Sequence, residues 1–251
     1  MSGHSKWATT KHKKGVLDKA RGKLFAKIIR QVEVAAREGG GDLEGNPTLR
    51  TMYQKARDSS VPMETIERAI KRGTGELEGV RYEPVVYEGY APCGVAVIVE
   101  CLTDNRNRTG ADIRAIFSKN GGSMAEPGAV SWQFERKGIV TMPHDGKFSE
   151  DDLMLVVADA GADDVRDNGD SWEIVTPPRE LAAVRSAVEA KGWPTSSSEL
   201  TMVPAQSVAI ESENDARKVL RLMDLLDDHD DVQNVYANFD IPDSVMDLVE
   251  V

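Results

Sequence analysis

The sequence predicts an α+β protein, with a helical amino-terminal domain followed by two α/β sandwich-type domains. One of these is ferredoxin-like and inserted in the other. Three observations lead to this prediction: helical periodicity up to about residue 73, apolar strand patterns from Tyr82 onward, and a complete strand–helix order within residues 138–205. A chain of 251 residues, of which 40% are hydrophobic, is long enough to form one large domain or two to three small ones.

The first helix is expected from Val16 to about Glu38. Each residue of an α-helix advances by about 100°, and this spacing places a set of apolar residues on one face: Leu17, Leu24, Ile28, Val32 and Ala35. Three consecutive glycines, Gly39–Gly41, then end the helix.

Two further helices follow within the first eighty residues. Asn46 is a favourable N-cap and Pro47 suits a first turn, so the second helix is expected to begin here. Pro62 opens the third helix, and Gly73 is expected to close it. The glycines between Gly73 and Gly79 indicate a linker.

The pattern changes to strands after Tyr82. Val85–Tyr90 is expected to form one strand, and Gly94–Leu102 is so apolar that it should be a central strand covered on both faces. A polar turn, Thr103–Arg108, follows this central strand.

A helix is then expected to start at Thr109, because Asp112 three residues later completes a capping-box-like pattern. Its buried side would carry Ile113 and Phe117. Alternation over Val130–Phe134 predicts a third strand.

Residues 138–205 have a self-contained order of elements. A strand at Ile139–Met142 is followed by a helix capped by Ser149 and a hairpin around Asn168–Gly169. A helix over Pro178–Lys191 and a strand at Leu200–Val203 complete the set. This β-α-β-β-α-β order is the ferredoxin-like split motif.

The remaining residues offer only one helix, about Glu213–Asp228, and one strand, Val232–Phe239. These two elements cannot bury a core alone, but they would complete the sheet begun by residues 81–137. We therefore expect residues 1–80 to form a basic tail and small helical domain, residues 81–137 plus 206–251 a discontinuous α/β domain, and residues 138–205 an inserted domain. In the alternative, three consecutive domains, the middle sheet has a single helix and an uncovered face.

Charge is distributed very unevenly along the chain. The first 37 residues contain ten Lys and Arg but only two acids, a net charge of +8, whereas the whole chain has −11. Residues 138–251 contain 8 basic and 25 acidic residues, a net charge of −17. A basic arm on an acidic protein indicates a polyanionic partner, which would approach the amino-terminal end.

The cations of the first helix gather on one side. Lys19, Lys23, Lys27, Arg30 and Arg37 fall within a sector of about 80°. Acidic residues at four-residue spacing, which would make the usual surface pairs, are not interleaved with them. The pattern favours contact with nucleic acid over the alternative, a solvated helix face.

Two further features could contact nucleic acid. Trp7 lies among lysines and can stack on a base or dock on the helical domain. Arg106 and Arg108 follow the most apolar strand, where they can bind phosphate or instead bond loop carbonyls and Asp104. The predicted nucleic-acid-binding residues are Lys6, Trp7, Lys11, Lys13, Lys14, Lys19, Arg21, Lys23, Lys27, Arg30, Arg106 and Arg108.

Catalytic and metal-binding patterns are not found, so we predict no catalytic residue, no metal site, no cofactor and no small-molecule substrate. The four histidines, His4, His12, His144 and His229, do not have metal-ligand spacing. The acidic run Asp227–Asp231 is interpreted as a solvated helix end, although a metal-dependent nuclease using such carboxylates is an alternative. The pattern favours a binding protein over an enzyme.

The sequence also predicts a cytoplasmic location. It contains no apolar run long enough to span a membrane and no apolar segment after the basic amino terminus, as a secretory signal would require. Its two cysteines, Cys93 and Cys101, are too few for a disulfide scaffold, and a reducing compartment is the simplest interpretation.

Several motifs stand out along the chain: Gly3–Trp7, Lys11–Lys14, Arg21–Lys23, Arg68–Gly73, Tyr87–Tyr90 and Leu102–Thr109. Together they resemble the YebC/PmpR family, and the chain is also similar to the mitochondrial translational activator of cytochrome oxidase subunit one. The resemblance implies a three-domain, non-enzymatic regulator of gene expression in the cytoplasm. Members are commonly described as DNA-binding transcriptional regulators, and others act on the ribosome during translation of proline-rich stretches. The chain departs from the family at Cys93, where glycine is usual, and at Glu126–Pro127, within a usually glycine-rich turn.

The residues favour RNA or the ribosome, whereas the usual family description favours DNA. The first and second predicted helices are separated by a glycine-rich loop of about seven residues, unlike the short turn of a helix-turn-helix motif. A lysine-dominated arm recognises phosphate and shape rather than base sequence.

Overall fold

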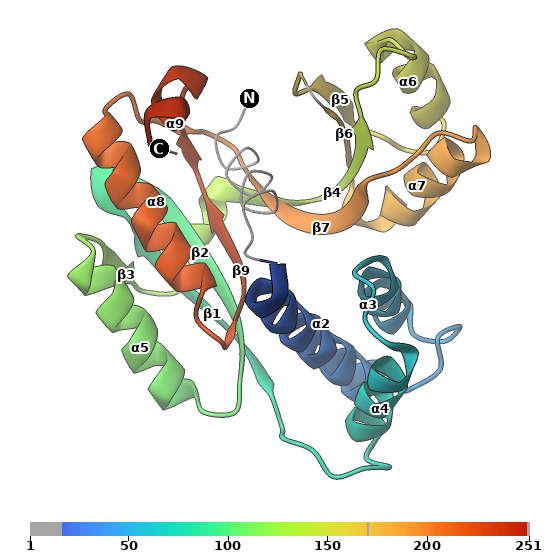
Figure 1. Cartoon of the computed structure of the whole chain (residues 1–251), viewed down its shortest axis with the longest axis horizontal. Coiled ribbons are helices and arrows are strands. Elements are labelled where there is room, and N and C mark those ends of the chain that lie inside the picture. Colours follow the sequence, from blue (N-terminus) through green and yellow to red (C-terminus); the bar gives the residue numbers. More distant parts are fainter. Residues whose placement is uncertain (1–16, 170, 250–251) are drawn as a thin grey trace. The chain divides into compact units, whose positions relative to one another are not determined.

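The computed structural model describes residues 17–169 and 171–249 (Figure 1). The chain divides into two compact units. Among the described residues, 17–131 and 208–249 form the larger unit, and those within Trp132–Ser207 form the smaller unit. Amino-terminal helices precede two four-stranded antiparallel sheets, so the predicted mixed α+β class is confirmed.

The larger unit begins with three helices, α2 (Leu17–Gly39), α3 (Pro47–Asp58) and α4 (Met63–Thr74). Asn46 caps α3 as predicted, because its side chain accepts the Leu49 N–H at 3.0 Å. Its Nδ2 donates to two carbonyls at the end of α2. The shared core consists of Ile28, Val32, Ala35, Ala36, Leu49, Ala56, Val61, Ile66 and Ala69.

The predicted end of α4 at Gly73 is wrong. The helix continues to Thr74, and Gly75, with φ of 85°, forms the left-handed cap. Gly73 instead lies where α4 crosses α2, and a Cβ there would collide with the carbonyl oxygen of Glu33 and approach Ala36 Cβ to 2.7 Å. Glycine therefore permits the close approach of two helices, a reason that local sequence does not reveal.

The sheet of the larger unit has the order β3-β1-β2-β9, with all neighbours antiparallel. Its strands are β1 (Glu83–Tyr90), β2 (Ala96–Thr103), β3 (Ser123–Ala125) and β9 (Val232–Ala237). All residues of β2 except Glu100 are buried. The prediction of a central strand is confirmed, although a tight turn at Pro92–Gly94 delays its start to Ala96.

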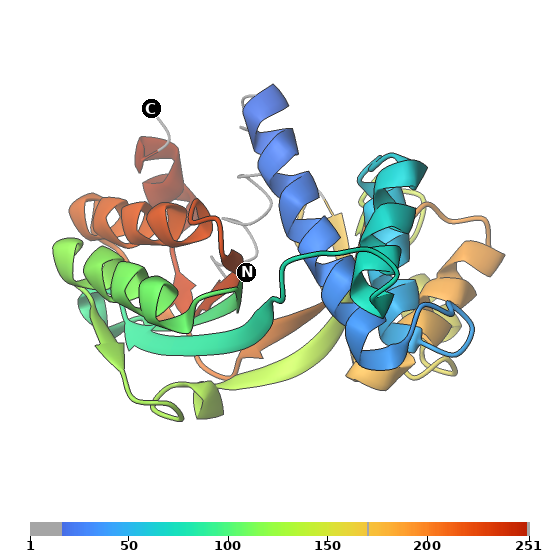
Figure 2. The same ribbon diagram turned by 90° about the horizontal axis from the view of Figure 1, so that it is seen from below.

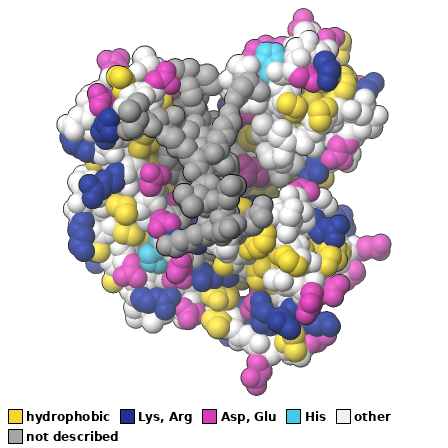
Figure 3. All heavy atoms as spheres, in the orientation of Figure 1, with side chains coloured by type: hydrophobic (Ala, Val, Ile, Leu, Met, Phe, Trp, Pro, Cys, Tyr) yellow, Lys and Arg dark blue, Asp and Glu magenta, His cyan; other side chains and the backbone are white. Residues whose placement is uncertain are grey.

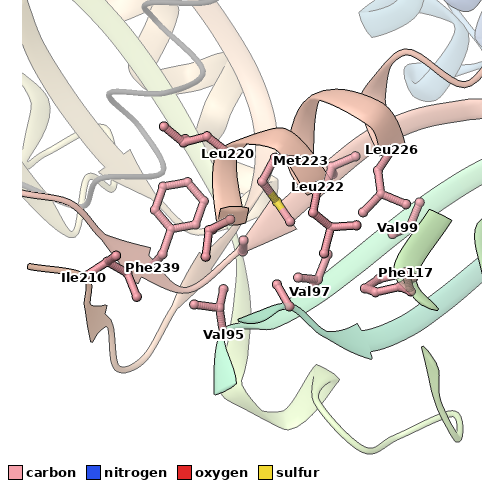
Figure 4. Close-up of a cluster of buried hydrophobic side chains, with 14 of the residues drawn as sticks. Val95, Val97, Val99, Phe117, Ile210, Leu220, Leu222, Met223, Leu226 and Phe239 are labelled. Carbon is pink, nitrogen blue, oxygen red and sulfur yellow. The ribbon is translucent and has the colours of Figure 1, made fainter. Parts of the chain in front are cut away.

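Helices α5 (Arg106–Lys119) and α8 (Glu213–Asp227) cover one face of this sheet (Figures 1 and 2). Figure 4 shows Val97 and Val99 of β2 pointing toward Leu222 and Met223 of α8, and Phe117 entering from α5. The elements that were not predicted include the edge strand β3, the short strand β8 (Val208–Ala209), which pairs with β10 (Phe239–Asp240), and α9 (Asp243–Val249), which packs on α8.

The predicted start of α5 at Thr109 is wrong by three residues. Asn105 is the N-cap, accepting the Arg108 N–H at 3.1 Å, while the Thr109 hydroxyl bonds Thr103 and Asp231 instead. Arg106 and Arg108 therefore lie in the first helical turn and not in a free loop.

The predicted strand at Val130–Phe134 is also wrong. Ser131–Gln133 forms a 3-10 turn, and the strand begins only at Phe134. The buried carboxylate of Glu88 accepts the N–H groups of Gly128, Val130 and Ser131, so two of these five residues donate to a side chain instead of a sheet ladder.

The smaller unit contains a four-stranded antiparallel sheet in the order β5-β6-β4-β7, the strand order of the ferredoxin-like split motif. The Ser149 cap and the Asn168–Gly169 turn are confirmed. The helix predicted from Pro178 begins only at Leu181, because Pro178–Glu180 forms a 3-10 turn. The elements are β4 (Phe134–Pro143), α6 (Glu150–Val157), β5 (Asp164–Asp167), β6 (Ser171–Thr176), α7 (Leu181–Ala190) and β7 (Ser197–Pro204).

The smaller unit has a hydrophobic core of its own. Ten buried residues form it, and each lies between Val140 and Val188: Val140, Met142, Leu153, Val157, Val165, Trp172, Ile174, Leu181, Val184 and Val188.

Candidate nucleic-acid interface

The structure describes the side chains of five of the twelve predicted contact residues. Lys6, Trp7, Lys11, Lys13 and Lys14 lie outside the described residues, and the side chains of Lys19 and Arg21 on α2 are outside the description too. The five that remain are Lys23, Lys27, Arg30, Arg106 and Arg108.

Three of these, Lys23, Lys27 and Arg30, form what we call the basic stripe of α2. Lys23 Nζ contacts Asp228 Oδ1 at 2.5 Å and the Asp228 carbonyl at 3.1 Å. Lys27 Nζ lies 2.7 Å from the Asp227 carbonyl and 3.3 Å from Asp227 Oδ1.

Arg30, the third member of the basic stripe, extends these contacts. Its Nη1 donates to the Asp230 carbonyl at 2.5 Å and lies 3.4 Å from Asp231 Oδ1. The stripe therefore contacts the acidic loop, Asp227–Asp231, which begins at the last residue of α8. The prediction that this acidic run is a solvated helix end is wrong, because three of its carboxylates are ion-paired to α2.

The negative charge at the C-terminal end of α8 explains why it attracts the basic stripe of α2. The last carbonyls of an α-helix lack intrahelical partners and carry partial negative charge. Two aspartates, Asp227 and Asp228, add full negative charge at this end, and the last turn has no basic residue. Lys23 and Lys27 supply the missing cations from about 200 residues away in the sequence.

Asp231 is the most deeply placed carboxylate of the acidic loop, with a side chain only 6% exposed. It accepts hydrogen bonds from Thr109 Oγ1 at 2.7 Å and Arg108 Nη2 at 2.9 Å, and Thr103 Oγ1 lies at 3.3 Å. Burial acts to raise the pKa of Asp231, but the hydrogen bonds from Thr109 and Arg108 outweigh it and hold the pKa below its usual value. Asp231 is therefore a fixed negative charge.

Arg108 has a structural role in this arrangement. Besides Asp231, it donates to Asp104 Oδ1 at 2.8 Å, which is the bonding alternative considered from the sequence. Its hydrogen bonds to Asp231 and Asp104 raise its pKa above the usual value.

Arg106 differs from Arg108. Its side chain is exposed, and only its backbone carbonyl is engaged, by the Tyr87 hydroxyl at 3.1 Å. Within residues 17–169 and 171–249, no hydrogen bond or ion pair involves its guanidinium. Arg106 is thus an exposed cation in the first turn of a helix, and this part of a helix favours bound anions.

A hollow of about 620 Å³ lies where α2, the start of α5 and the acidic loop meet. The guanidinium of Arg30 lies over the Tyr82 ring at 5.1 Å from its centroid. Oppositely charged groups share the walls, which are lined by Lys23, Arg30, Tyr82, Asp104, Arg108, Asp112, Asp228, His229, Asp230 and Asp231.

Basic and acidic side chains are also interspersed on the outer surface. In the described part of the face drawn in Figure 3, Lys and Arg side chains lie scattered among Asp and Glu rather than gathered into one broad basic surface. Among the described residues, no group of three or more His, Cys, Asp or Glu side chains could hold a metal ion. No helix within the same ranges is long and apolar enough to cross a membrane.

The short turn between α3 and α4 was not predicted, because the helix-turn-helix pattern was sought only in the loop between the first and second helices. The two helices are joined by four residues, Ser59–Pro62, the turn length of a helix-turn-helix motif. The recognition helix of that motif contacts bases with its amino-terminal residues. In α4 the exposed residues at this end include Glu64 and Glu67, which repel the phosphate backbone.

Comparison with known proteins identifies the family. The model of the TACO1/YebC protein N-terminal domain matches residues 5–76, and the model of the TACO1/YebC second and third domain matches residues 82–239. The chain belongs to the TACO1/YebC family. The resemblance seen in the sequence is thereby confirmed.

Relatives of this YebC-family chain match it over nearly its whole length. A probable transcriptional regulatory protein of Thermobifida fusca is 56% identical over 247 residues, 98% of each chain. One from Syntrophobacter fumaroxidans is 55% identical over 249 residues, 99% of this chain and 100% of the relative. The crystal structure of a conserved hypothetical protein from Aquifex aeolicus is 46% identical with a TM-score of 0.81, covering 90% of this chain and 93% of that one.

Proposed function

We propose that this YebC-family protein is a non-enzymatic, nucleic-acid-binding regulator of gene expression in the cytoplasm. The observation that carries the proposal is the separation of charge, +8 in the first 37 residues against −17 in residues 138–251. A polyanion would be attracted to one end of the chain and repelled by the other. The names of the relatives, probable transcriptional regulatory proteins, support a regulatory role.

Contact is expected through the basic arm and α2, with Arg106 as a further cation. Lysine-rich surfaces bind the phosphate backbone, which provides affinity and position but carries no base sequence directly. The acidic start of α4 supports this mode over major-groove reading by a recognition helix. The predicted contacts are Lys6, Trp7, Lys11, Lys13, Lys14, Lys19, Arg21, Lys23, Lys27, Arg30, Arg106 and Arg108.

Salt dependence of binding tests this proposal. Each phosphate contact contributes a slope of about −0.7 to −0.9 in a plot of log affinity against log salt. Replacing Lys19, Lys23 and Lys27 by Ala should therefore reduce the magnitude of the slope by about two to three, equally for unrelated sequences. Fluorescence anisotropy over a salt series measures the slope, and circular dichroism checks that α2 persists, since alanine favours helix.

A matched variant removes three exposed cations elsewhere in the larger unit, Arg114, Lys119 and Arg221. This variant loses the same charge and should retain most of the slope. If both variants behave like the wild type, the α2 face does not bind nucleic acid, and Arg106 becomes the leading candidate.

A second candidate function is that of a ribosome-associated translation factor that contacts structured RNA. The observation that favours it is again the acidic amino-terminal end of α4, which argues against base reading in duplex DNA. Sedimentation of a cell lysate through a sucrose gradient separates the two candidates. Co-migration with ribosomes supports the translation factor, whereas migration in the free fractions supports the DNA-binding regulator.

A further inference from the structure

The basic stripe of α2 already has a ligand within the same chain. We propose that the acidic loop, Asp227–Asp231, is an internal mimic of phosphate that occupies the stripe and must leave before the stripe binds nucleic acid. This inference rests on the proposed function and concerns how the same surface is regulated. It would make the exposure of the α2 surface an equilibrium between a docked and a released state.

The contacts of the loop are those that a phosphate backbone would make. Each of Lys23, Lys27 and Arg30 donates both to a carbonyl oxygen and to a carboxylate oxygen of the loop. Three cations on successive turns of α2 thus contact carbonyl and carboxylate oxygens of neighbouring loop residues. These are the donors predicted to contact phosphate, so the loop and nucleic acid compete for the same groups.

The exposure of the three aspartates in these pairs increases toward the amino-terminal end of α2. At that end the side chains of Lys23 and Asp228 are 33% and 71% exposed, whereas at the other end those of Arg30 and Asp231 are 21% and 6% exposed. An exposed ion pair contributes little to stability and is weakened by salt. The contact can therefore open from the Lys23 end at small cost.

Release of the deepest pair does not leave a bare buried charge. Removing one partner of a buried ion pair is normally strongly destabilising because the other charge is left uncompensated. Asp231, however, retains Arg108 at 2.9 Å and Thr109 at 2.7 Å when Arg30 departs. The acidic loop can therefore keep its conformation after α2 has been released.

Docking nevertheless lowers the apparent affinity for nucleic acid. Asp227 and Asp228 lie at the negative end of α8, where they are stabilised by Lys27 and Lys23. A ligand that binds only the released state has its affinity reduced by the fraction of molecules in that state. Weakening the docked state should therefore tighten binding.

The test neutralises the loop in the full-length protein with Asp227→Asn, Asp228→Asn and Asp230→Asn together. Binding of a short DNA duplex and of an RNA hairpin, both of arbitrary sequence, should tighten roughly three- to tenfold as the released fraction rises. The matched control Glu126→Gln, Glu199→Gln and Glu211→Gln removes the same three charges from exposed positions outside the loop. It reports the effect of net charge alone.

The single variant Asp228→Asn serves if the triple variant does not fold, since Asp228 is the most exposed of the ion-paired carboxylates of the loop. Hydrogen exchange of the wild type gives an independent readout. Amides of the acidic loop should exchange faster once nucleic acid is bound, because the side chains of α2 no longer hold the carbonyl and carboxylate oxygens of the loop. A purely long-range charge effect would leave this exchange unchanged.

The outcomes separate the two proposals. If the wild type binds, but the loop variant binds no tighter than the control and loop exchange is unchanged, the internal mimic is wrong and the proposed function stands. If neither the wild type nor the loop variant binds DNA or RNA, the internal mimic and the proposed function are both wrong.

Discussion

Single residues in this chain are set by backbone geometry as much as by side-chain chemistry. Cys93 has φ of 65° and is followed by Gly94 with φ of 76°, so both central residues of the turn between β1 and β2 are left-handed. Such a pair is typical of a type I′ turn, which normally carries Asn or Gly at these positions. Cys93, where the resemblance to the family predicts glycine, thus stands at a strained position.

Replacing Cys93 by Gly is expected to stabilise the protein. The left-handed conformation destabilises the folded state by about 1–2 kcal/mol when the residue has a Cβ. Glycine avoids this strain, but its greater freedom in the unfolded chain lowers the free energy of unfolding by about 0.5–1 kcal/mol. The free energy of unfolding should rise by about 0.5–1 kcal/mol, as measured by urea denaturation. Cys93→Ala keeps the Cβ and is the control; an equal gain from alanine would mean that backbone strain is not the cause.

Short-range patterns predicted residues whose partners are close in the sequence. The caps Asn46 and Ser149 are confirmed because each bonds a backbone N–H three residues ahead. Asp231 was not recognised as a buried centre, because its partners Arg30, Thr103 and Arg108 come from α2, β2 and α5. The spacing of residues along the sequence does not show such tertiary contacts between distant elements.

At the scale of elements, the helices and strands were mostly found, but several ends were not. Asn105 and Thr109 are both good caps, and only the bonds of Thr109 to Thr103 and Asp231 decide that Asn105 starts α5. Gly73 looked like a helix end, but it marks the crossing of α4 with α2. Tertiary contacts selected between local alternatives in both cases.

The crossing of α2 and α4 gives an element-scale prediction. Gly73→Ala would place a methyl group against the Glu33 carbonyl and Ala36, both in the well-packed part of α2. Overpacking of this kind costs about 1–3 kcal/mol, and thermal denaturation should show a lower Tm.

Gly22→Ala on α2 is the matched control for this substitution. A Cβ at position 22 meets no described atom within 4 Å, so the higher helix propensity of alanine should stabilise the protein by up to about 1 kcal/mol. Equal effects of the two substitutions would mean that the close approach of α2 and α4 does not constrain position 73.

At the scale of the whole molecule, the sequence predicted the charge separation and the family but not the pairing of the basic stripe with the acidic loop. Asp227 and Lys27 are 200 residues apart, and each was interpreted within its own helix. The expectation that no acid lies at four-residue spacing among the cations of α2 favoured an external anion, but Glu33 pairs with Arg37 at that spacing. The complementary acids are supplied by another element of the same chain.

The last prediction concerns the smaller unit, which we propose folds independently as an insertion. Its ten core residues all come from within Trp132–Ser207, and its strand order is complete without any segment from elsewhere. A fragment of residues 132–207 should therefore show a single cooperative thermal transition by circular dichroism. Val140→Ala and Ile174→Ala, at fully buried core positions, should each lower its Tm, because each leaves a cavity. A fragment without a transition would contradict the insertion and require contacts from the rest of the chain.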